Sequence, residues 1–301
     1  MNGLAESIRQ RLLNLARERG EDFDYVLRQY VIQRLLFRLS QSKFKEQYLL
    51  KGAQLFWVWN EAFHRPTRDV DLLGFGENDV SGLVKIFQDI CSIEVEDGLR
   101  FDSQSIRGIE IKEDATYQGV RVTGTAELAR AKIPFQVDVG FGDVVTPDPE
   151  LIEMPVFLNL PAPSLRAYPV YTVMAEKFQA MVYLGLANSR MKDFYDIWFL
   201  ASSMELEGRL LVEAVKATFA QRETAINIEP LILFEKSFTR DKNKLTQWNA
   251  FVKKNGVSDV PDFAETMQKL EILLNPVYRC IANNQGFNLI WSSSDWQWKG
   301  S

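Results

Sequence analysis

Residues 49–75 read LLKGAQLFWVWNEAFHRPTRDVDLLGF, and they carry the most specific pattern in the chain. It joins a Lys-Gly turn, a short apolar helix predicted over residues 53–60, a basic loop, and a strand that carries Asp69 and Asp71. Side chains two apart on a strand point to the same face, so these two carboxylates stand side by side. Paired carboxylates hold hard divalent ions such as Mg²⁺, which keep further positions open for phosphate oxygens. Gly52 can turn tightly and leave backbone N–H groups at the helix start, where phosphate binds.

A lone Asp-x-Asp is weak evidence, because solvated carboxylates are common at strand ends. The order of glycine turn, helix, loop and Asp-x-Asp strand is more specific, because nucleotidyltransferases of the polymerase β type begin in this way. Three segments sharpen the likeness: Leu-Lys-Gly-Ala at 50–53, Arg-Pro-Thr-Arg-Asp-Val-Asp at 65–71 and Asn-Ser-Arg-Met-Lys-Asp-Phe-Tyr-Asp at 188–196. In them the chain resembles the AbiEii/AbiGii family of nucleotidyltransferase toxins, which includes the MenT toxins that modify tRNA. The resemblance extends from about residue 12 to about residue 220.

The resemblance implies an α+β fold. Its core is a polymerase β-like nucleotidyltransferase domain, with a mixed or antiparallel sheet flanked by helices and preceded by N-terminal helices. A mostly helical C-terminal domain then contributes to the active-site cleft. Six prolines between residues 147 and 169 exclude a regular helix or a central strand there and predict a linker that folds back over the sheet. We therefore place the domain boundary between residues 1–165 and 166–301.

Hydrophobic periodicity gives the remaining elements. It predicts a first helix over 4–19 and a second that begins at a cap, Asp22 or Asp24, and ends near residue 39. Further helices are predicted over 80–91, 170–186, 190–203, 208–218, 242–253 and 262–281. Extended segments are predicted over 105–112, 117–128 and 132–141, and the alternation of the last two suits antiparallel strands with one buried face. Three tryptophans in the last few positions of the chain cap the helical domain or stack on a substrate base. We favour the first reading.

Composition places the chain among ordinary globular proteins, with 46% hydrophobic and 25% charged residues in a length of 301. No stretch has the length and apolarity of a membrane span or a signal peptide, so we expect a cytoplasmic protein without a membrane partner. Two cysteines and one histidine exclude zinc sites, haem attachment and histidine-based triads. The net charge of −5 argues against indiscriminate coating of nucleic acid.

Basic residues gather near the N-terminus, where residues 1–51 hold ten Lys or Arg against six Asp or Glu. This section could line a path for a polyanion, or it could consist of solvated helix faces. Arg34 and Arg38 are i,i+4 neighbours on the second helix and, with Arg65 in the basic loop, are the candidate RNA contacts. The alternative is that they are ordinary surface cations.

Phosphate binding by the turn departs from the polymerase β pattern at Ala53. In those enzymes a serine commonly follows the turn glycine and its hydroxyl contacts the triphosphate. Here the backbone around Gly52 and Ala53 remains a cradle, while the side-chain contact is absent. Thr67 and Lys51 are the candidate substitutes in the nucleotide site.

Further site residues follow from the resemblance. Asp138 lies on the polar face of the last predicted strand, where from pattern alone it is equally a solvated residue; the resemblance makes it the third metal-binding carboxylate. Lys177 corresponds to a lysine that binds the triphosphate, although its pattern alone indicates a surface lysine. Lys192 and Asp193 correspond to residues that orient the nucleotide or RNA end, although charges in that pattern usually form a solvated helix start.

What the resemblance implies is a metal-dependent nucleotidyltransferase of the EC 2.7.7 type, the toxin of an AbiE-like type IV toxin–antitoxin or phage-defence system. Asp69, Asp71 and Asp138 would hold Mg²⁺ or Mn²⁺, with Lys177 and Asp193 completing the catalytic set. A nucleotide would pass from an NTP to RNA, foremost the 3′ end of tRNA, and a cognate antitoxin would be encoded nearby. Two alternatives stay open: transfer to a protein or small molecule, and a catalytically silent member that binds a nucleotide or RNA.

Overall fold

Two compact units make up the chain. The computed structural model describes residues 2–60, 65–76, 78–112, 118–257 and 259–300. The N-terminal unit comprises residues 1–63, 67–143 and 150–167, and the C-terminal unit comprises residues 64–66, 144–149 and 168–301. The boundary predicted at 165/166 falls inside the last strand of the N-terminal unit, and two short segments on the N-terminal side of it group with the C-terminal unit.

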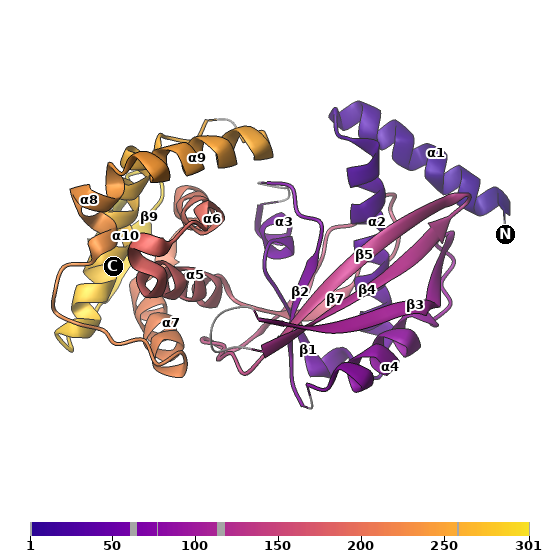
Figure 1. Ribbon diagram of the computed structural model, residues 1–301, viewed down its shortest axis with the longest axis horizontal. Helices are drawn as coiled ribbons and strands as arrows, with labels where there is room; N and C mark the ends of the chain where they lie inside the picture. Colours follow the sequence, from indigo (N-terminus) through magenta and orange to yellow (C-terminus); the bar gives the residue numbers. More distant parts are fainter. Residues whose placement is uncertain (1, 61–64, 77, 113–117, 258, 301) are drawn as a thin grey trace. The chain divides into compact units, whose positions relative to one another are not determined.

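A seven-stranded mixed sheet forms the centre of the N-terminal unit (Figure 1). Its order is β3-β4-β5-β2-β1-β7-β6. The strands are β1 (Tyr48–Lys51), β2 (Val70–Gly74), β3 (Leu99–Lys112), β4 (Gln118–Leu128), β5 (Ala131–Phe141), β6 (Glu150–Glu153) and β7 (Ser164–Ala167). The pairs β2–β5 and β1–β7 are parallel and the others are antiparallel. The expected antiparallel pairing of the last two predicted segments, β4 and β5, is confirmed, although residue 117, the expected start of the first of them, lies outside the described residues.

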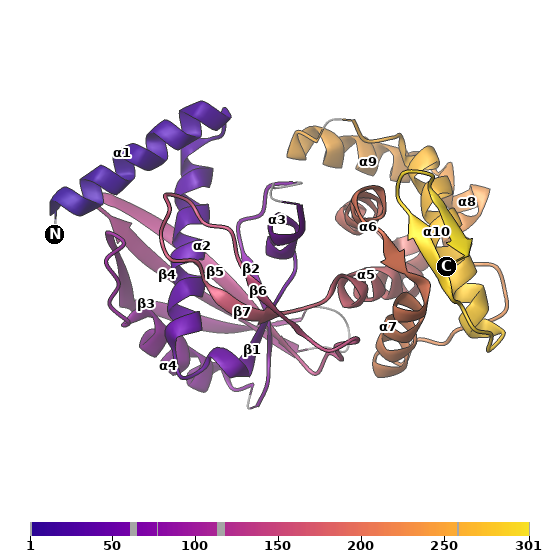
Figure 2. The same ribbon diagram turned by 180° about the vertical axis from the view of Figure 1, so that it is seen from behind.

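Helices cover one face of this sheet and leave the other polar. They are α1 (Asn2–Arg19), α2 (Phe23–Gln41), α3 (Gln54–Asn60) and α4 (Val80–Cys91), with a 3-10 turn at Lys45–Gln47. Both α2 and α4 pack on the sheet, and α2 passes behind the long strands in Figure 1 and in front of them in Figure 2. The inward side chains of β5 alternate with outward ones, so Val137 is buried against the helices while Gln136 is half-exposed on the opposite face.

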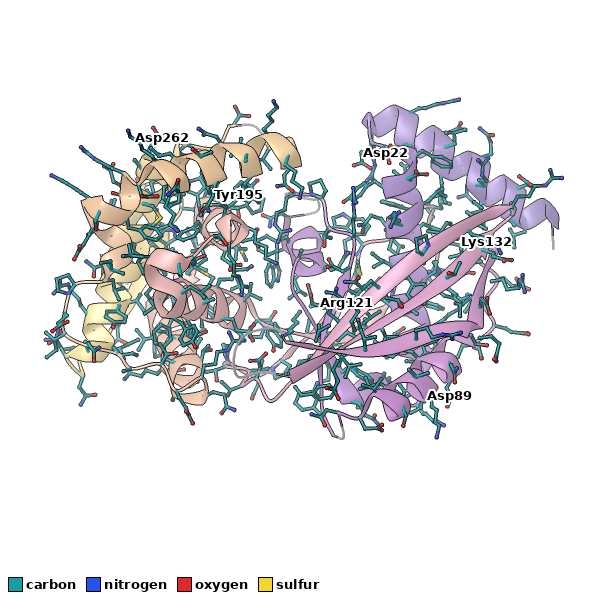
Figure 3. The ribbon with its side chains drawn as sticks, in the orientation of Figure 1. Asp22, Asp89, Arg121, Lys132, Tyr195 and Asp262 are labelled. Atoms are coloured by element: carbon teal, nitrogen blue, oxygen red, sulfur yellow. The ribbon has the colours of Figure 1, made fainter. Side chains whose placement is uncertain are left out.

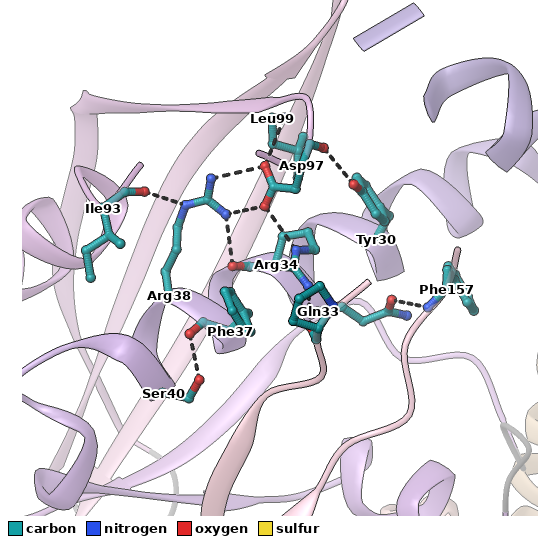
Figure 4. A network of polar contacts seen from close by, with 11 residues as sticks. Tyr30, Gln33, Arg34, Phe37, Arg38, Ser40, Ile93, Asp97, Leu99 and Phe157 are labelled. Atoms are coloured by element: carbon teal, nitrogen blue, oxygen red, sulfur yellow. Dashed lines mark hydrogen bonds and ion pairs between the residues drawn. The ribbon is translucent and has the colours of Figure 1, made fainter. Parts of the chain in front are cut away.

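Arg34 and Arg38 lie in the interior, with 0% and 2% of their surface exposed. Both guanidinium groups bind the buried carboxylate of Asp97 (Figure 4). Arg34 Nε lies 3.0 Å from Oδ2, and Arg38 contacts both oxygens at 2.6 and 3.2 Å. The prediction that these two arginines contact RNA is therefore wrong, because neither side chain reaches a surface that RNA could touch.

Backbone carbonyls satisfy further donors of this network. Arg38 Nε donates to the carbonyl of Ile93 at 3.0 Å, and Arg34 Nη1 donates to that of Pro161 at 2.7 Å. The Tyr30 hydroxyl donates to the backbone carbonyl of Asp97 at 2.6 Å (Figure 4), and burial, with the Asp97 charge adding to it, raises the pKa of Tyr30 above its ordinary value. The network thus ties α2 to the segment before β3 and to the loop that follows β6.

The proline-rich span contains two strands as well as a linker. β6 and β7 pair antiparallel, and β7 pairs with β1, so that β6 forms the edge of the sheet. The prolines delimit these strands, since Pro149 precedes β6, Pro163 precedes β7 and Pro169 follows it. A linker alone was expected, and the difference arises because each strand has four residues and fits between prolines.

The C-terminal unit is mostly helical, as predicted. Its helices are α5 (Val170–Leu184), α6 (Met191–Ser203), α7 (Gly208–Gln221), α8 (Lys236–Thr239), α9 (Lys242–Asn255) and α10 (Phe263–Ala282), with 3-10 turns at Gly185–Ala187 and Ile232–Phe234. A small sheet of β8 (Leu206–Glu207), β9 (Leu289–Ser292) and β10 (Gln297–Gly300) completes it. Trp291, Trp296 and Trp298 each donate their indole N–H to a backbone carbonyl of this unit, so the tail packs on the helices.

Among the residues that the structure describes, no helix combines the length and the apolar composition needed to cross a bilayer.

Candidate active site

Strand register aligns four charged side chains across the polar face of the sheet. Lys51 of β1 pairs with Asp71 of β2, Asp71 pairs with Asp138 of β5, and Asp138 pairs with Arg121 of β4. Residues paired across neighbouring strands point to the same side, so all four side chains share one face. We call this set the charged row. Asp69 lies two residues before Asp71 on the same face, and we include it in the charged row.

The two carboxylates of Asp-Val-Asp are half-buried. Thr67 is buried, and its hydroxyl donates to Asp69 Oδ1 at 3.0 Å. Thr67 is itself fixed by Gln29, whose amide donates to its carbonyl at 2.7 Å. Thr67 was a candidate nucleotide contact, and in the structure its hydroxyl orients a carboxylate.

Asp138 joins the row but is held by Arg121, which is labelled in Figure 3. The guanidinium binds both carboxylate oxygens at 2.8 Å, a bidentate geometry that is among the stronger ionic contacts. The hydrogen bond to Asp138 raises the pKa of Arg121, and the charges of Asp69 and Asp71 act in the same direction. Arg121 therefore lies in the field of all three carboxylates. The alternation along β4 places Arg121 on the polar face, but only the β4–β5 register identifies Asp138 as its partner.

Gly52 provides the space that Asp71 occupies. Its φ is +77°, and a Cβ built there would lie 2.0 Å from Asp71 Oδ2. The preceding Lys51 is buried, and its ammonium lies 3.0 Å from Asp143 Oδ2, a partner that the sequence did not indicate. The expected nucleotide contact of Lys51 stays a prediction, since its ammonium is shared with Asp143 here. Ala53, which follows the turn, is buried.

Replacing Gly52 by Ala should lower the free energy of unfolding by about 2 kcal/mol, because the positive φ is strained for Ala and the new methyl group displaces Asp71. Activity should fall roughly a hundredfold, the cost of moving a reacting group by about 1 Å. Urea denaturation and nucleotide-transfer rates would measure the two effects.

Gly20→Ala is the matched control, because Gly20 has a φ of +66° but nothing within 4 Å of its built Cβ. It should show the backbone strain alone and full activity. Equal losses of activity in both variants would contradict the role given to Gly52.

A second charged cluster lies in the C-terminal unit, where α5 and α6 bring Lys177 to two fully buried aspartates. Lys177 Nζ lies 2.7 Å from Asp196 Oδ2 and 3.1 Å from Asp193 Oδ1. Arg190 Nε lies 2.7 Å from Asp193 Oδ2. Arg65 binds both oxygens of Asp196 at 2.8 and 2.9 Å.

Three cations thus surround two carboxylates. Burial disfavours the charged form of Lys177, but Asp196 and Asp193 outweigh it, so the pKa of Lys177 is raised above its ordinary value. The lysine remains an ammonium at neutral pH. Arg65, an expected RNA contact, is mostly buried and uses its guanidinium to fix Asp196, while Lys192 is exposed.

Asp196 is the last residue of the motif at 188–196, but no role was predicted for it from the sequence. In the structure Asp196 joins Lys177 to Arg65, which makes it the centre of the cluster. The predicted site residues are therefore brought together within each unit: Asp69, Asp71 and Asp138 with Gly52 in one, and Lys177 with Asp193 in the other.

The donor set of the charged row fits a hard divalent ion. Asp69 and Asp71 offer carboxylate oxygens on one half-exposed face, which leaves room for water and phosphate oxygens in the remaining positions. Within the described part of the chain, no three acidic, cysteine or histidine side chains already converge on one point.

Two solved structures are similar to this chain: JHP933 from Helicobacter pylori, at 14% identity and a TM-score of 0.47, and a protein of the same organism described provisionally as a nucleotidyltransferase, at 14% identity and a TM-score of 0.48. They cover 86% and 87% of this chain, and the chain covers 94% and 97% of theirs. No curated protein matches the sequence.

The family described as "Nucleotidyl transferase AbiEii toxin, Type IV TA system" matches residues 34–269, which is more than half of the chain. The match includes the Gly52 turn, the Asp69–Asp71 strand and the Lys177 cluster. The chain therefore belongs to the AbiEii family of nucleotidyltransferase toxins of type IV toxin–antitoxin systems, which makes it a transferase that uses a nucleotide and is paired with an antitoxin.

Proposed function

We propose that this toxin transfers a nucleotide from an NTP to a hydroxyl of RNA, with the 3′ end of tRNA as the first candidate, and so blocks translation. The hydroxyl oxygen bonds to the α-phosphorus and gives up its proton to solvent, the bond from that phosphorus to its bridging oxygen breaks, and pyrophosphate leaves with the electron pair of that bond. The observation that carries the proposal is the charged row, in which Asp71 and Asp138 stand in register and Asp69 shares their face. Such transfer needs positioning and neutralisation of charge more than a covalent nucleophile.

Asp69 and Asp71 would hold Mg²⁺ or Mn²⁺, with Asp138 as the third carboxylate. A divalent ion bound there neutralises phosphate charge and lowers the pKa of a hydroxyl that approaches it. Thr67 keeps Asp69 in place by its hydrogen bond, and the missing Cβ of Gly52 keeps the position of Asp71 accessible.

The amide groups of the Gly52–Ala53 turn would bind phosphates of the NTP, and Lys177 of the C-terminal unit has the role of triphosphate contact that the family resemblance implies. The raised pKa of Lys177 supports this role, because the ammonium stays charged while its carboxylate partners hold it in place. Asp193 and the exposed Lys192 would orient the nucleotide or the RNA end. Both substrates occur in the cytoplasm, where we place the reaction, and the antitoxin would be encoded beside the toxin.

Two other functions compete with this one. A protein or small molecule as acceptor is compatible with the net charge of −5, which disfavours broad nucleic-acid binding. A catalytically silent member that only binds a nucleotide or RNA is favoured by Ala53, which lacks the hydroxyl usual at that place.

The test is the transfer of label from each of four α-³²P NTPs, with Mg²⁺, to total tRNA in one reaction and to total protein in another. We expect label in tRNA from one nucleotide, and none with Asp69→Ala, because that change removes a carboxylate of the row. Thermal unfolding should show that Asp69→Ala is folded, since the change also relieves repulsion between neighbouring carboxylates.

Label found only in protein would show that the acceptor is a protein and would overturn the RNA acceptor proposed here. The absence of label in both, from folded protein, would favour the silent member. Label in tRNA that persists with Asp69→Ala would contradict the site assignment.

A further inference from the structure

A cavity of about 450 Å³ opens beside Asp69 in the N-terminal unit. Besides Asp69, its lining includes Arg28, Arg68, Thr123, Thr125 and Gln136. This volume lies within the range of small-ligand sites and suits one nucleotide residue. None of these five further residues has a role in the reaction described so far.

The register places the cavity on the face that carries the carboxylates. Thr123 pairs with Gln136, and this pair lies two residues along the strands from the pair of Arg121 and Asp138. Side chains two apart on a strand share a face, so the cavity continues the charged row along β4 and β5.

The cavity and the Gly52 turn lie on opposite sides of β2. Gly52 follows β1, which pairs with one edge of β2, whereas β5 and β4 lie beyond the other edge. In phosphoryl-type transfer the attacking and leaving oxygens are roughly in line on either side of the phosphorus. If the turn holds the leaving pyrophosphate, the attacking hydroxyl must come from the side of β5, where the cavity is.

The charge of the lining suits a phosphodiester. Arg68 is exposed and Arg28 half-buried, and neither guanidinium forms an ion pair with any residue described in the structure. A guanidinium binds phosphate oxygens in a bidentate manner. The two threonine hydroxyls and the amide of Gln136 offer donors and acceptors for a ribose or a base edge.

We propose that this cavity receives the 3′-terminal nucleotide of the acceptor RNA, with its ribose hydroxyl beside Asp69 and the adjoining backbone phosphates bound by Arg28 and Arg68. The inference rests on the proposed function and names the acceptor side of the same site. It makes the two arginines positioning residues for RNA, without a role in holding the NTP.

The binding test uses a 5′-fluorescein-labelled single-stranded RNA that ends in CCA with a 3′-deoxyadenosine, which binds but cannot accept a nucleotide. Fluorescence anisotropy would compare the parent with Arg28→Gln/Arg68→Gln. The Kd should rise at least about tenfold, because each variant position loses a charge-assisted contact. The slope of log K against log salt should become shallower by about 1.4, the value for two phosphates of a single strand.

Arg130→Gln/Lys132→Gln is the matched control, since it removes the same charge from exposed positions that do not line the cavity. Lys132 is labelled in Figure 3. The control should leave Kd within about twofold of the parent. Arg68→Gln alone, at an exposed position, provides a variant whose folding is unaffected and should show roughly half of the change in the salt slope.

Steady-state transfer separates the acceptor from the nucleotide. The double variant should raise the KM for tRNA and leave the KM for NTP within twofold. A higher KM for NTP with unchanged RNA binding would assign the cavity to the nucleotide and overturn the proposal, as would equal Kd values for variant and control. Anisotropy does not require turnover, so a parent that binds this RNA through the arginines but transfers no label would refute the proposed function and leave the cavity assignment in place.

Discussion

Asp97→Asn is expected to lower the free energy of unfolding by about 4 kcal/mol. The change keeps the volume of the side chain and removes its charge, which leaves Arg34 and Arg38 buried without a counter-ion. Removing one partner of a buried ion pair typically costs 3–5 kcal/mol, because the remaining charge is uncompensated. Two guanidiniums share this carboxylate, so the loss should not fall at the lower end of that range. Urea denaturation followed by circular dichroism would measure the loss.

The matched control is Asp89→Asn, at an aspartate labelled in Figure 3. Asp89 lies 3.5 Å from Lys43, and both side chains are largely exposed, at 60% and 74%. Exposed pairs contribute about 0–1 kcal/mol, so the same chemical change should be nearly neutral there. If Asp97→Asn cost no more than Asp89→Asn, the network would not be the fixed link between α2 and the segment before β3 that the contacts describe.

This network marks a limit of sequence reasoning. The spacing of Arg34 and Arg38 correctly places them on one side of a helix. Spacing along one helix cannot say which side is buried when the counter-charge comes from Asp97, far along the chain. Two arginines four residues apart therefore look like surface cations in the sequence, and only the tertiary structure supplies the carboxylate and carbonyls that make burial possible.

The local sequence pattern correctly predicted the long strands and the faces to which their side chains point. The alternation along β4 and β5 gave both the strands and the polar face that carries Asp138, and the Asp-x-Asp spacing gave the shared face of Asp69 and Asp71. The short strands β1, β6 and β7 were missed, because four residues are too few for a periodic signal.

The ion pairs within the site were harder to predict from the sequence. Arg121 had no role among the sequence predictions, and its contact with Asp138 depends on the β4–β5 register. The ion pairs Lys51–Asp143 and Arg65–Asp196 each join residues far apart in the sequence, and no sequence pattern identifies the partner. The resemblance to a family supplied the chemistry, and the register supplies the geometry that supports it.

Asp71→Asn should reduce nucleotide transfer at least about a thousandfold while the protein remains folded. Asn fits the space beside Gly52, where even a methyl group on the glycine would overlap the Asp71 carboxylate, so packing is preserved. The lost charge stands at the centre of the row, paired in register with both Lys51 and Asp138. A thousandfold corresponds to about 4 kcal/mol of transition-state stabilisation, the scale expected when a ligand of the proposed divalent ion is removed.

Two measurements separate this role from a structural one. Titration with Mn²⁺ followed by electron paramagnetic resonance should show weaker binding in Asp71→Asn, and urea denaturation should show unfolding within about 1 kcal/mol of the parent, because removing one of several neighbouring carboxylates relieves repulsion. Asp102→Asn, at an exposed aspartate of β3, should leave both the rate and Mn²⁺ binding unchanged. A folded Asp71→Asn protein with more than a tenth of the parent rate would remove Asp71 from the reaction, and with it the argument that the β1–β2–β5 register builds the metal site.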